Sequence, residues 1–164
     1  MDIHLTAQEV FVLAKEIEIK AEQFYLQAAG AAGDLITQQL FLSLAVMEKL
    51  HGQVFDGMGA SGGDGRLEAT TPDKDKFRRI WPLLAGTMVQ DIDKELPKFF
   101  KGRRSSQEIL RAAMDFERDT IVLFYGIKEM MNRPADRQRL DDIMKEEMGH
   151  LISLGSQLAC LGQA

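Results

Sequence analysis

Four stretches of the chain repeat apolar residues with the period of an α-helix. In the first stretch, Val10, Leu13 and Ile17 recur at intervals close to 3.6 residues, which places them on one side of a helix. The four predicted helices cover residues 6–29, 34–55, 105–131 and 135–161. The apolar stripe of the second helix is predicted at Leu40, Leu44, Met47, Leu50 and Val54.

Local signals mark where these helices begin and end. Ser105-Ser106-Gln107-Glu108 offers a hydroxyl at the N-cap and a carboxylate three residues later, which is the pattern of a capping box. Thr6-Ala7-Gln8-Glu9 has the same pattern before the first helix. Gly30 and Gly33 end the first helix, and Asn132-Arg133-Pro134 separates the third from the fourth. The helices therefore form two predicted hairpins.

Residues 56–104 make a long connection between the hairpins. Gly57–Gly65 is rich in glycine, which predicts a loop. A short helix over about 75–95 is expected, with Pro82 delaying its start or bending it. We therefore predict an all-α fold: a single domain over residues 1–164, built as a four-helix bundle with one long crossover.

The two hairpins repeat one pattern of acidic residues and histidines at a constant offset. Each hairpin has a lone Glu on its first helix, and a Glu-x-x-His on its second helix 30 residues later. The matching positions differ by 99, as in 117 − 18, 147 − 48 and 150 − 51. The pairs are Glu18 and Glu117, Glu48 and Glu147, and His51 and His150. The two hairpins are thus an internal repeat of one unit.

This spacing predicts a metal site with two ions. Residues three apart on a helix share one face, so each Glu-x-x-His can direct two ligands at one point. Four carboxylates and two imidazoles in a bundle centre form the pattern of di-iron or di-manganese proteins. Two divalent cations would offset the charge of four carboxylates, whose burial alone would be strongly unfavourable. Glu48 and Glu147 are the expected bridging ligands, and iron or manganese suits the donor set.

The alternative to a metal site is that the Glu-x-x-His motifs lie on solvated helix faces, and the sequence favours this alternative less. A single Glu-x-x-His most often lies on a solvated helix face. The chain has only three histidines, however, and two of them complete the motif at the matched offset. His4 lies outside the repeat and is expected at the surface.

The residues also resemble a known family. Glu18 with Tyr25, Glu48-Lys49-Leu50-His51, Glu117 with Tyr125, and Glu147-Met148-Gly149-His150 resemble the di-iron domain of rubrerythrins, within the ferritin-like superfamily. The resemblance covers nearly the whole chain and is weakest in the crossover. It implies a ferritin-like bundle, two iron ions, oxidation by dioxygen or hydrogen peroxide, and a homodimer or larger assembly. Tyr25 and Tyr125 are candidate hydrogen-bond donors to ligand carboxylates, or ordinary core aromatics.

Two departures from the family affect the expected activity. Rubrerythrins usually carry a four-cysteine rubredoxin-like site, whereas this chain has Cys160 alone. An external electron-donor protein is therefore expected. Rubrerythrins also carry an extra glutamate three residues after the ligand of the third helix, where this chain has Thr120. That departure weighs against efficient peroxidase turnover.

Composition limits the remaining function classes. The net charge of −5 and pI near 5.2 argue against a nucleic-acid binder. No apolar run is long enough for a membrane span, no secretory signal is visible, and one cysteine favours the reducing cytoplasm. Lys98-Phe99-Phe100-Lys101-Gly102-Arg103-Arg104 is predicted as a solvated loop, with a partner contact as the alternative. Trp81, Phe99 and Phe100 are the residues expected in a homodimer contact.

Three functions fit these observations. The first is a non-haem di-iron oxidoreductase that reacts with dioxygen or hydrogen peroxide. The second is a ferroxidase that passes iron to a store. The third is a structural bundle that binds metal without turnover. The sequence does not separate iron from manganese, because both use the same ligands.

Overall fold

The structure is a computed structural model in which residues 7–60, 92–131 and 133–162 are described. These residues form five helices and no strand. The helices are α1 (Ala7–Ala31), α2 (Leu35–Ala60), α5 (Ile92–Lys101), α6 (Ser106–Met130) and α7 (Pro134–Gly162). The predicted all-α fold class is confirmed.

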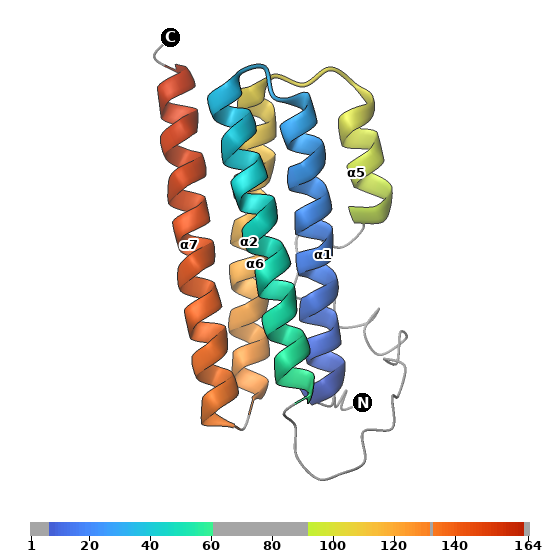
Figure 1. Ribbon diagram of the computed structural model, residues 1–164, viewed down its shortest axis with the longest axis vertical. Helices are drawn as coiled ribbons and strands as arrows, with labels where there is room; N and C mark the ends of the chain where they lie inside the picture. Colours follow the sequence, from blue (N-terminus) through green and yellow to red (C-terminus); the bar gives the residue numbers. More distant parts are fainter. Residues whose placement is uncertain (1–6, 61–91, 132, 163–164) are drawn as a thin grey trace.

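The four long helices pack side by side as two antiparallel pairs (Figure 1). α1 packs along α2, and α6 packs along α7. The pairs meet where α1 contacts α6 and where α2 contacts α7. The end of α2 and the start of α6 lie at opposite ends of the bundle (Figure 1). The predicted arrangement, a four-helix bundle with one long crossover, is therefore confirmed.

Aromatic pairs join the two hairpins in the core. Ile17 and Phe24 of the predicted first stripe are almost completely buried. The ring of Phe24 stacks on Phe116 of α6 with centroids 5.8 Å apart, and Phe55 of α2 contacts Phe124 of α6 at 5.3 Å. Such pairs contribute about 0.5–1.5 kcal/mol each beyond the area that they bury. They fix how one hairpin sits against the other.

Helix α5 covers the outer side of α1 and corrects two predictions. Residues 98–101 belong to this helix, so the prediction of a solvated loop over 98–104 is wrong there. Phe99 and Phe100 are half-buried, and their ring centroids lie 6.4 and 5.7 Å from that of Phe24. The predicted helix over 75–95 lies mostly outside the described residues, as do Trp81 and Pro82, and the end predicted at 95 is wrong because α5 runs from 92 to 101.

The inward face of α2 differs from the predicted stripe. Leu50 and Val54 are 48% and 39% exposed, whereas Phe41 is fully buried. The reason is that Glu48 and His51 point inward and set the rotation of the helix. Leu50 and Val54 then fall on the outer side of α2.

Helix α2 also continues further than predicted. Residues 57–60 are helical and Met58 is fully buried, so the loop prediction is wrong for these four residues. The rest of that glycine-rich segment, residues 61–65, lies outside the described residues. Burial of Phe55 and Met58 outweighs the cost of a glycine within the helix, which is about 1 kcal/mol.

Caps define the starts of two helices. The predicted capping box of α6 is present: the Ser105 side chain accepts from the Glu108 backbone N–H, and the Glu108 carboxylate accepts from the Ser105 backbone N–H at 2.9 Å. At the start of α2, Asp34 accepts from the Thr37 backbone N–H at 2.8 Å. The side chains of residues 6–9 lie outside the described set, and so does His4.

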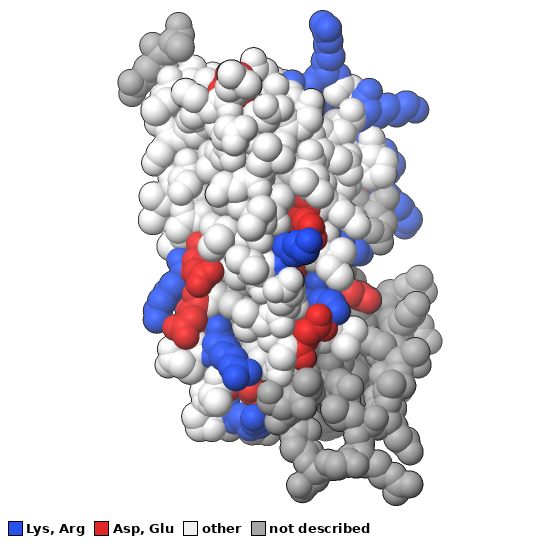
Figure 2. All heavy atoms as spheres, in the orientation of Figure 1, with Lys and Arg blue, Asp and Glu red and all other residues white. Residues whose placement is uncertain are grey.

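One end of the face formed by α2 and α7 carries few charged side chains (Figure 2). Residues 35–47 and 151–162 contain none. Large apolar side chains are exposed on α2 in this region, at Leu35, Ile36, Leu42 and Val46. None of the helices in the described part of the chain is long and apolar enough to span a membrane.

Candidate metal centre

Six side chains from the four long helices converge inside the bundle. They are Glu18 of α1, Glu48 and His51 of α2, Glu117 of α6, and Glu147 and His150 of α7. Each residue is between 0% and 6% exposed. The structure therefore brings together all six positions that the internal repeat singles out.

The side chains form two groups of potential metal ligands. The first group contains Glu18, Glu48, His51 and Glu147, and the second contains Glu48, Glu117, Glu147 and His150. Within each group, one ligand atom per residue lies within 4.8 Å of the others. Glu48 and Glu147 belong to both groups, which is the placement expected of ligands shared by two ions.

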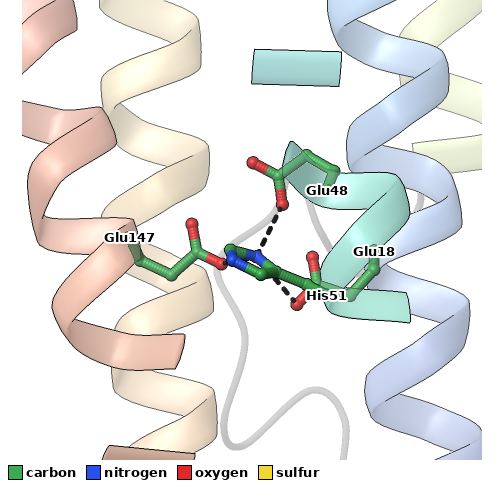
Figure 3. Close-up of side chains that lie close together, drawn as sticks. All are labelled: Glu18, Glu48, His51 and Glu147. Carbon is green, nitrogen blue, oxygen red and sulfur yellow. Dashed lines mark ion pairs between the residues drawn. The ribbon is translucent and has the colours of Figure 1, made fainter. Parts of the chain in front are cut away.

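Each histidine directs Nδ1 at the carboxylates. His51 Nδ1 lies 2.8 Å from Glu147 Oε1 and 3.5 Å from Glu48 Oε2, as Figure 3 shows from the α2 side. Glu18 Oε1 is 4.0 Å from the same nitrogen. His150 Nδ1 lies 2.9 Å from Glu147 Oε2 and 3.0 Å from Glu48 Oε1. The two imidazole rings are stacked with centroids 5.6 Å apart.

Many of these buried atoms lack a hydrogen bond of acceptable geometry. They include both oxygens of Glu18, both oxygens of Glu147, and Nδ1 of His51 and of His150. Buried polar atoms without partners are costly, at about 1–3 kcal/mol each. Ligand atoms that converge at short distances without hydrogen bonds point to positions between them that metal ions could share. Carboxylate oxygens and imidazole nitrogens are donors that iron and manganese accept, so the residues fit a pair of metal ions.

Without metal, the cluster balances its charge with protons. Burial raises the pKa of Glu18 well above its usual range, and the carboxylates of Glu147 and Glu48 raise it further. Burial likewise raises the pKa of Glu117, and the neighbouring Glu147 adds to this. Burial opposes protonation of His51, but the carboxylates of Glu147 and Glu48 outweigh it and raise its pKa to about 10.

The second histidine and the central glutamate behave as a pair. Burial opposes protonation of His150, but Glu117, Glu147 and Glu48 raise its pKa to about 12. Burial would raise the pKa of Glu147, yet His150 and His51 lower it to about 2. Two imidazolium ions thus occupy the charge-balancing role that divalent cations would take.

Two side chains outside the six form hydrogen bonds with members of the cluster. Tyr25, fully buried on α1, donates a hydrogen bond to Oε1 of Glu117 across the bundle. Glu146 of α7 accepts a hydrogen bond from Nε2 of His51 at 2.8 Å. The Glu146 side chain is half exposed while it makes this contact.

Tyr125 does not reach the cluster. It is 57% exposed, so both predicted roles of Tyr125, a donor to a ligand carboxylate and a core aromatic, are wrong. The internal repeat does not match Tyr25 with Tyr125, because 25 + 99 = 124 and that residue is Phe124. Phe124 is fully buried but has no hydroxyl group to donate. Tyr25 is thus the tyrosine that contacts the cluster among the described residues.

Thr120 lies one turn after Glu117 and is buried. Its hydroxyl has no hydrogen-bond partner within the described structure. A threonine side chain is shorter than a glutamate, and it bears no charge.

Comparison with known proteins supports the fold. A crystal structure from Thermotoga maritima, described as a candidate ferritin-like diiron-carboxylate protein, superposes with a TM-score of 0.67. It is 20% identical in sequence, over 95% of this chain and 96% of that chain. The chain therefore has the ferritin-like fold. No protein-family model and no curated protein matches its sequence.

Proposed function

We propose that this protein is a non-haem di-iron oxidoreductase that reacts with dioxygen or hydrogen peroxide. The observation that carries the proposal is the pair of buried ligand groups that share Glu48 and Glu147. The Thermotoga maritima structure of the same fold, described as a candidate diiron-carboxylate protein, supports iron as the metal. Manganese, or a mixture of the two metals, would use the same ligands.

The protein residues have defined tasks in this proposal. Glu18 and His51 would hold one ion, Glu117 and His150 the other, and Glu48 and Glu147 both. Iron held there would supply electrons to the oxidant. The surrounding apolar core keeps bulk water from the ligands, and the Tyr25 hydroxyl fixes the orientation of Glu117.

Further parts of the proposal concern partners and location. The chain has one cysteine, exposed Cys160, so these residues contain no rubredoxin-type centre. We therefore propose that a separate electron-donor protein reduces the iron. We also propose a cytoplasmic location, because single-cysteine usage suits a reducing compartment. The resemblance to rubrerythrins is retained as the finer family proposal, and it rests on the sequence motifs.

Anaerobic titration tests the metal centre. Metal-free protein should bind two ferrous ions per chain, and addition of peroxide or dioxygen should then produce a rapid absorbance change in a stopped-flow instrument. The variant Glu48→Ala/Glu147→Ala should lose most of its metal, because it lacks both shared ligands. Glu16→Ala is the matched control, since Glu16 is exposed on α1 two residues from Glu18.

The outcomes separate the three candidate functions. One rapid reaction that stops, and restarts when a rubredoxin-type donor is added, supports the oxidoreductase. Continued oxidation of added ferrous iron far beyond two ions per chain would identify an iron-storing ferroxidase instead. Metal binding without any oxidant-dependent change would leave a structural bundle. Two metals retained by the double variant would contradict the site itself.

A further inference from the structure

The internal repeat is conserved at the six candidate ligands but broken directly beside them. Subtracting the offset from Glu146 gives 146 − 99 = 47, which is Met47. Adding it to Tyr25 gives 25 + 99 = 124, which is Phe124. Each polar neighbour in one half thus corresponds to an apolar residue in the other half. The two ligand groups have equivalent ligands and different surroundings.

The first difference concerns the histidines. His51 donates Nε2–H to the Glu146 carboxylate at 2.8 Å, so Nδ1, which faces Glu48 and Glu147, is the nitrogen that would lose its proton when a metal ion binds. A carboxylate on the outer nitrogen fixes this tautomer and makes the inner nitrogen a stronger donor to metal. His150 Nε2 is buried and has no hydrogen-bond partner among the described residues. Its tautomer is therefore not fixed in this way.

The second difference concerns the lone glutamates. Tyr25 donates to Oε1 of Glu117, the oxygen that lies 3.5 Å from His150 Nδ1. That hydrogen bond occupies a lone pair and withdraws electron density from the oxygen. Both oxygens of Glu18 lack a hydrogen bond, and Phe124 cannot supply one. Both differences therefore give the stronger donors to the group that contains His51.

We propose that the two metal positions are unequal, and that the group of Glu18, Glu48, His51 and Glu147 binds the first divalent cation. Glu146 acts as the positioning residue that makes His51 the better ligand. The inference rests on the proposed metal centre. Removing an outer partner of a ligating histidine typically weakens metal binding about 10–100-fold. The two dissociation constants should therefore differ by about 10-fold or more.

Titration of the metal-free protein with Co²⁺ measures this difference without redox chemistry. Calorimetry and cobalt absorbance should resolve two steps, the first about 10-fold tighter or more. His150→Ala should keep the tight step, whereas His51→Ala should lose it. Retention of the tight step by His51→Ala, with its loss in His150→Ala, would overturn the assignment.

Variants at the broken positions test the cause. Glu146→Gln should weaken the first step about 10-fold or more and change the second less than about threefold. Asp142→Asn is the matched control, because exposed Asp142 lies one turn away on α7 and contacts Lys145 at 3.4 Å rather than His51. Met47→Glu places a carboxylate at the position that the repeat matches with Glu146, and it should strengthen the second step if this carboxylate reaches His150. Circular dichroism checks that each variant folds.

The failure of this inference differs from the failure of the proposed function. Two Co²⁺ ions bound with equal affinity would overturn the inequality and leave the metal centre standing. Equal weakening of both steps by Glu146→Gln would also overturn it. A protein that binds no Co²⁺ would contradict the metal centre as well.

Discussion

Each cluster histidine holds a proton that a metal ion must displace. The carboxylates raise the pKa of His51 to about 10 and that of His150 to about 12, so both are protonated at pH 7 without metal. Metal binding requires neutral imidazole. We expect at least two protons to be released per chain when both positions fill at pH 7. Calorimetry in buffers of different ionisation enthalpy counts them, and release of none would contradict the described charge balance.

A second prediction concerns the tyrosine inside the bundle. Tyr25→Phe removes the donor to Glu117 while keeping the ring, so a buried carboxyl group loses its partner. The free energy of unfolding of the metal-free protein should fall by about 1–3 kcal/mol, measured by urea denaturation. Tyr125→Phe is the matched control on the same chain. Its side chain is exposed, so the change should stay within about 0.5 kcal/mol.

The candidate ligands were predictable from sequence, but their neighbours were not. Glu18, Glu48 and His51 recur at a fixed offset, and helical spacing alone places such residues on one face. Whether Glu146 reaches His51 depends on how α7 is rotated against α2. The sequence of α7 alone does not determine this rotation. Tyr125 was predicted by counting from a family motif, although the repeat itself points to Phe124. The ligand roles of the six residues stay a prediction.

At the scale of helices, the capping box of α6 can be tested. Ser105→Ala removes the side-chain acceptor of the Glu108 backbone N–H, which lies 3.2 Å from the Ser105 hydroxyl. The free energy of unfolding should fall by about 1 kcal/mol. Ser153→Ala serves as the control, because Ser153 lies within α7 and bonds only the carbonyl of Gly149 in the preceding turn. An equal effect of the two changes would argue against the cap.

Helix positions in the crossover show where local signals fail. Glycines predicted a loop after residue 56, but buried Met58 keeps α2 helical to Ala60. The basic segment over residues 98–104 was predicted as a solvated loop, yet residues 98–101 belong to α5. Its Phe100 packs on Phe24, far away in sequence, at 5.7 Å between ring centroids. Contacts across such a separation leave no trace in the local pattern, so the four long helices and a short helix in the crossover were predictable, but the bounds of α5 were not.

At the scale of the whole molecule, the response to pH should depend on metal. Without metal, the raised pKa values of Glu18 and Glu117 contribute stability below about pH 4.5, which is lost as pH rises. The histidines contribute below about pH 6.5, and this is lost towards pH 10 and 12. The metal-free protein should therefore lose up to about 1.4 kcal/mol per pH unit for each proton held between pH 5 and 9.

The loaded protein should show the opposite trend. Its folded ligands are deprotonated, whereas the unfolded histidines bind protons below about pH 6.5, so stability should rise from pH 5 to 7. Urea denaturation at several pH values, with and without chelation, measures both slopes. In the metal-free protein, the lowered pKa of Glu147 opposes the main trend at low pH, because its contribution to stability is lost as pH falls towards about 2. Parallel slopes for the two forms would argue against a buried metal centre.

A homodimer or larger assembly stays a prediction, and the structure changes its expected contact. Phe99 and Phe100 are partly buried against the core, which leaves less of their surface for a partner. The uncharged end of the α2 and α7 face suits a second copy better, because exposed apolar side chains gather there. Val46→Glu should shift a dimer to monomer in light scattering. Unchanged mass, or a monomeric parent at high concentration, would contradict this contact.

Because the two hairpins belong to one chain, they can carry different residues at matched positions. In an assembly of two identical hairpins, a two-fold axis would pass between the metal positions. Any substitution beside one histidine would then appear beside the other. The matched positions 47 and 146 could not hold different residues, as they do here with Met47 and Glu146. A single polypeptide lifts this restriction, so the ligands can stay matched while their neighbours diverge. Covalent linkage would thus permit a symmetrical ligand set to bind two ions with different affinities.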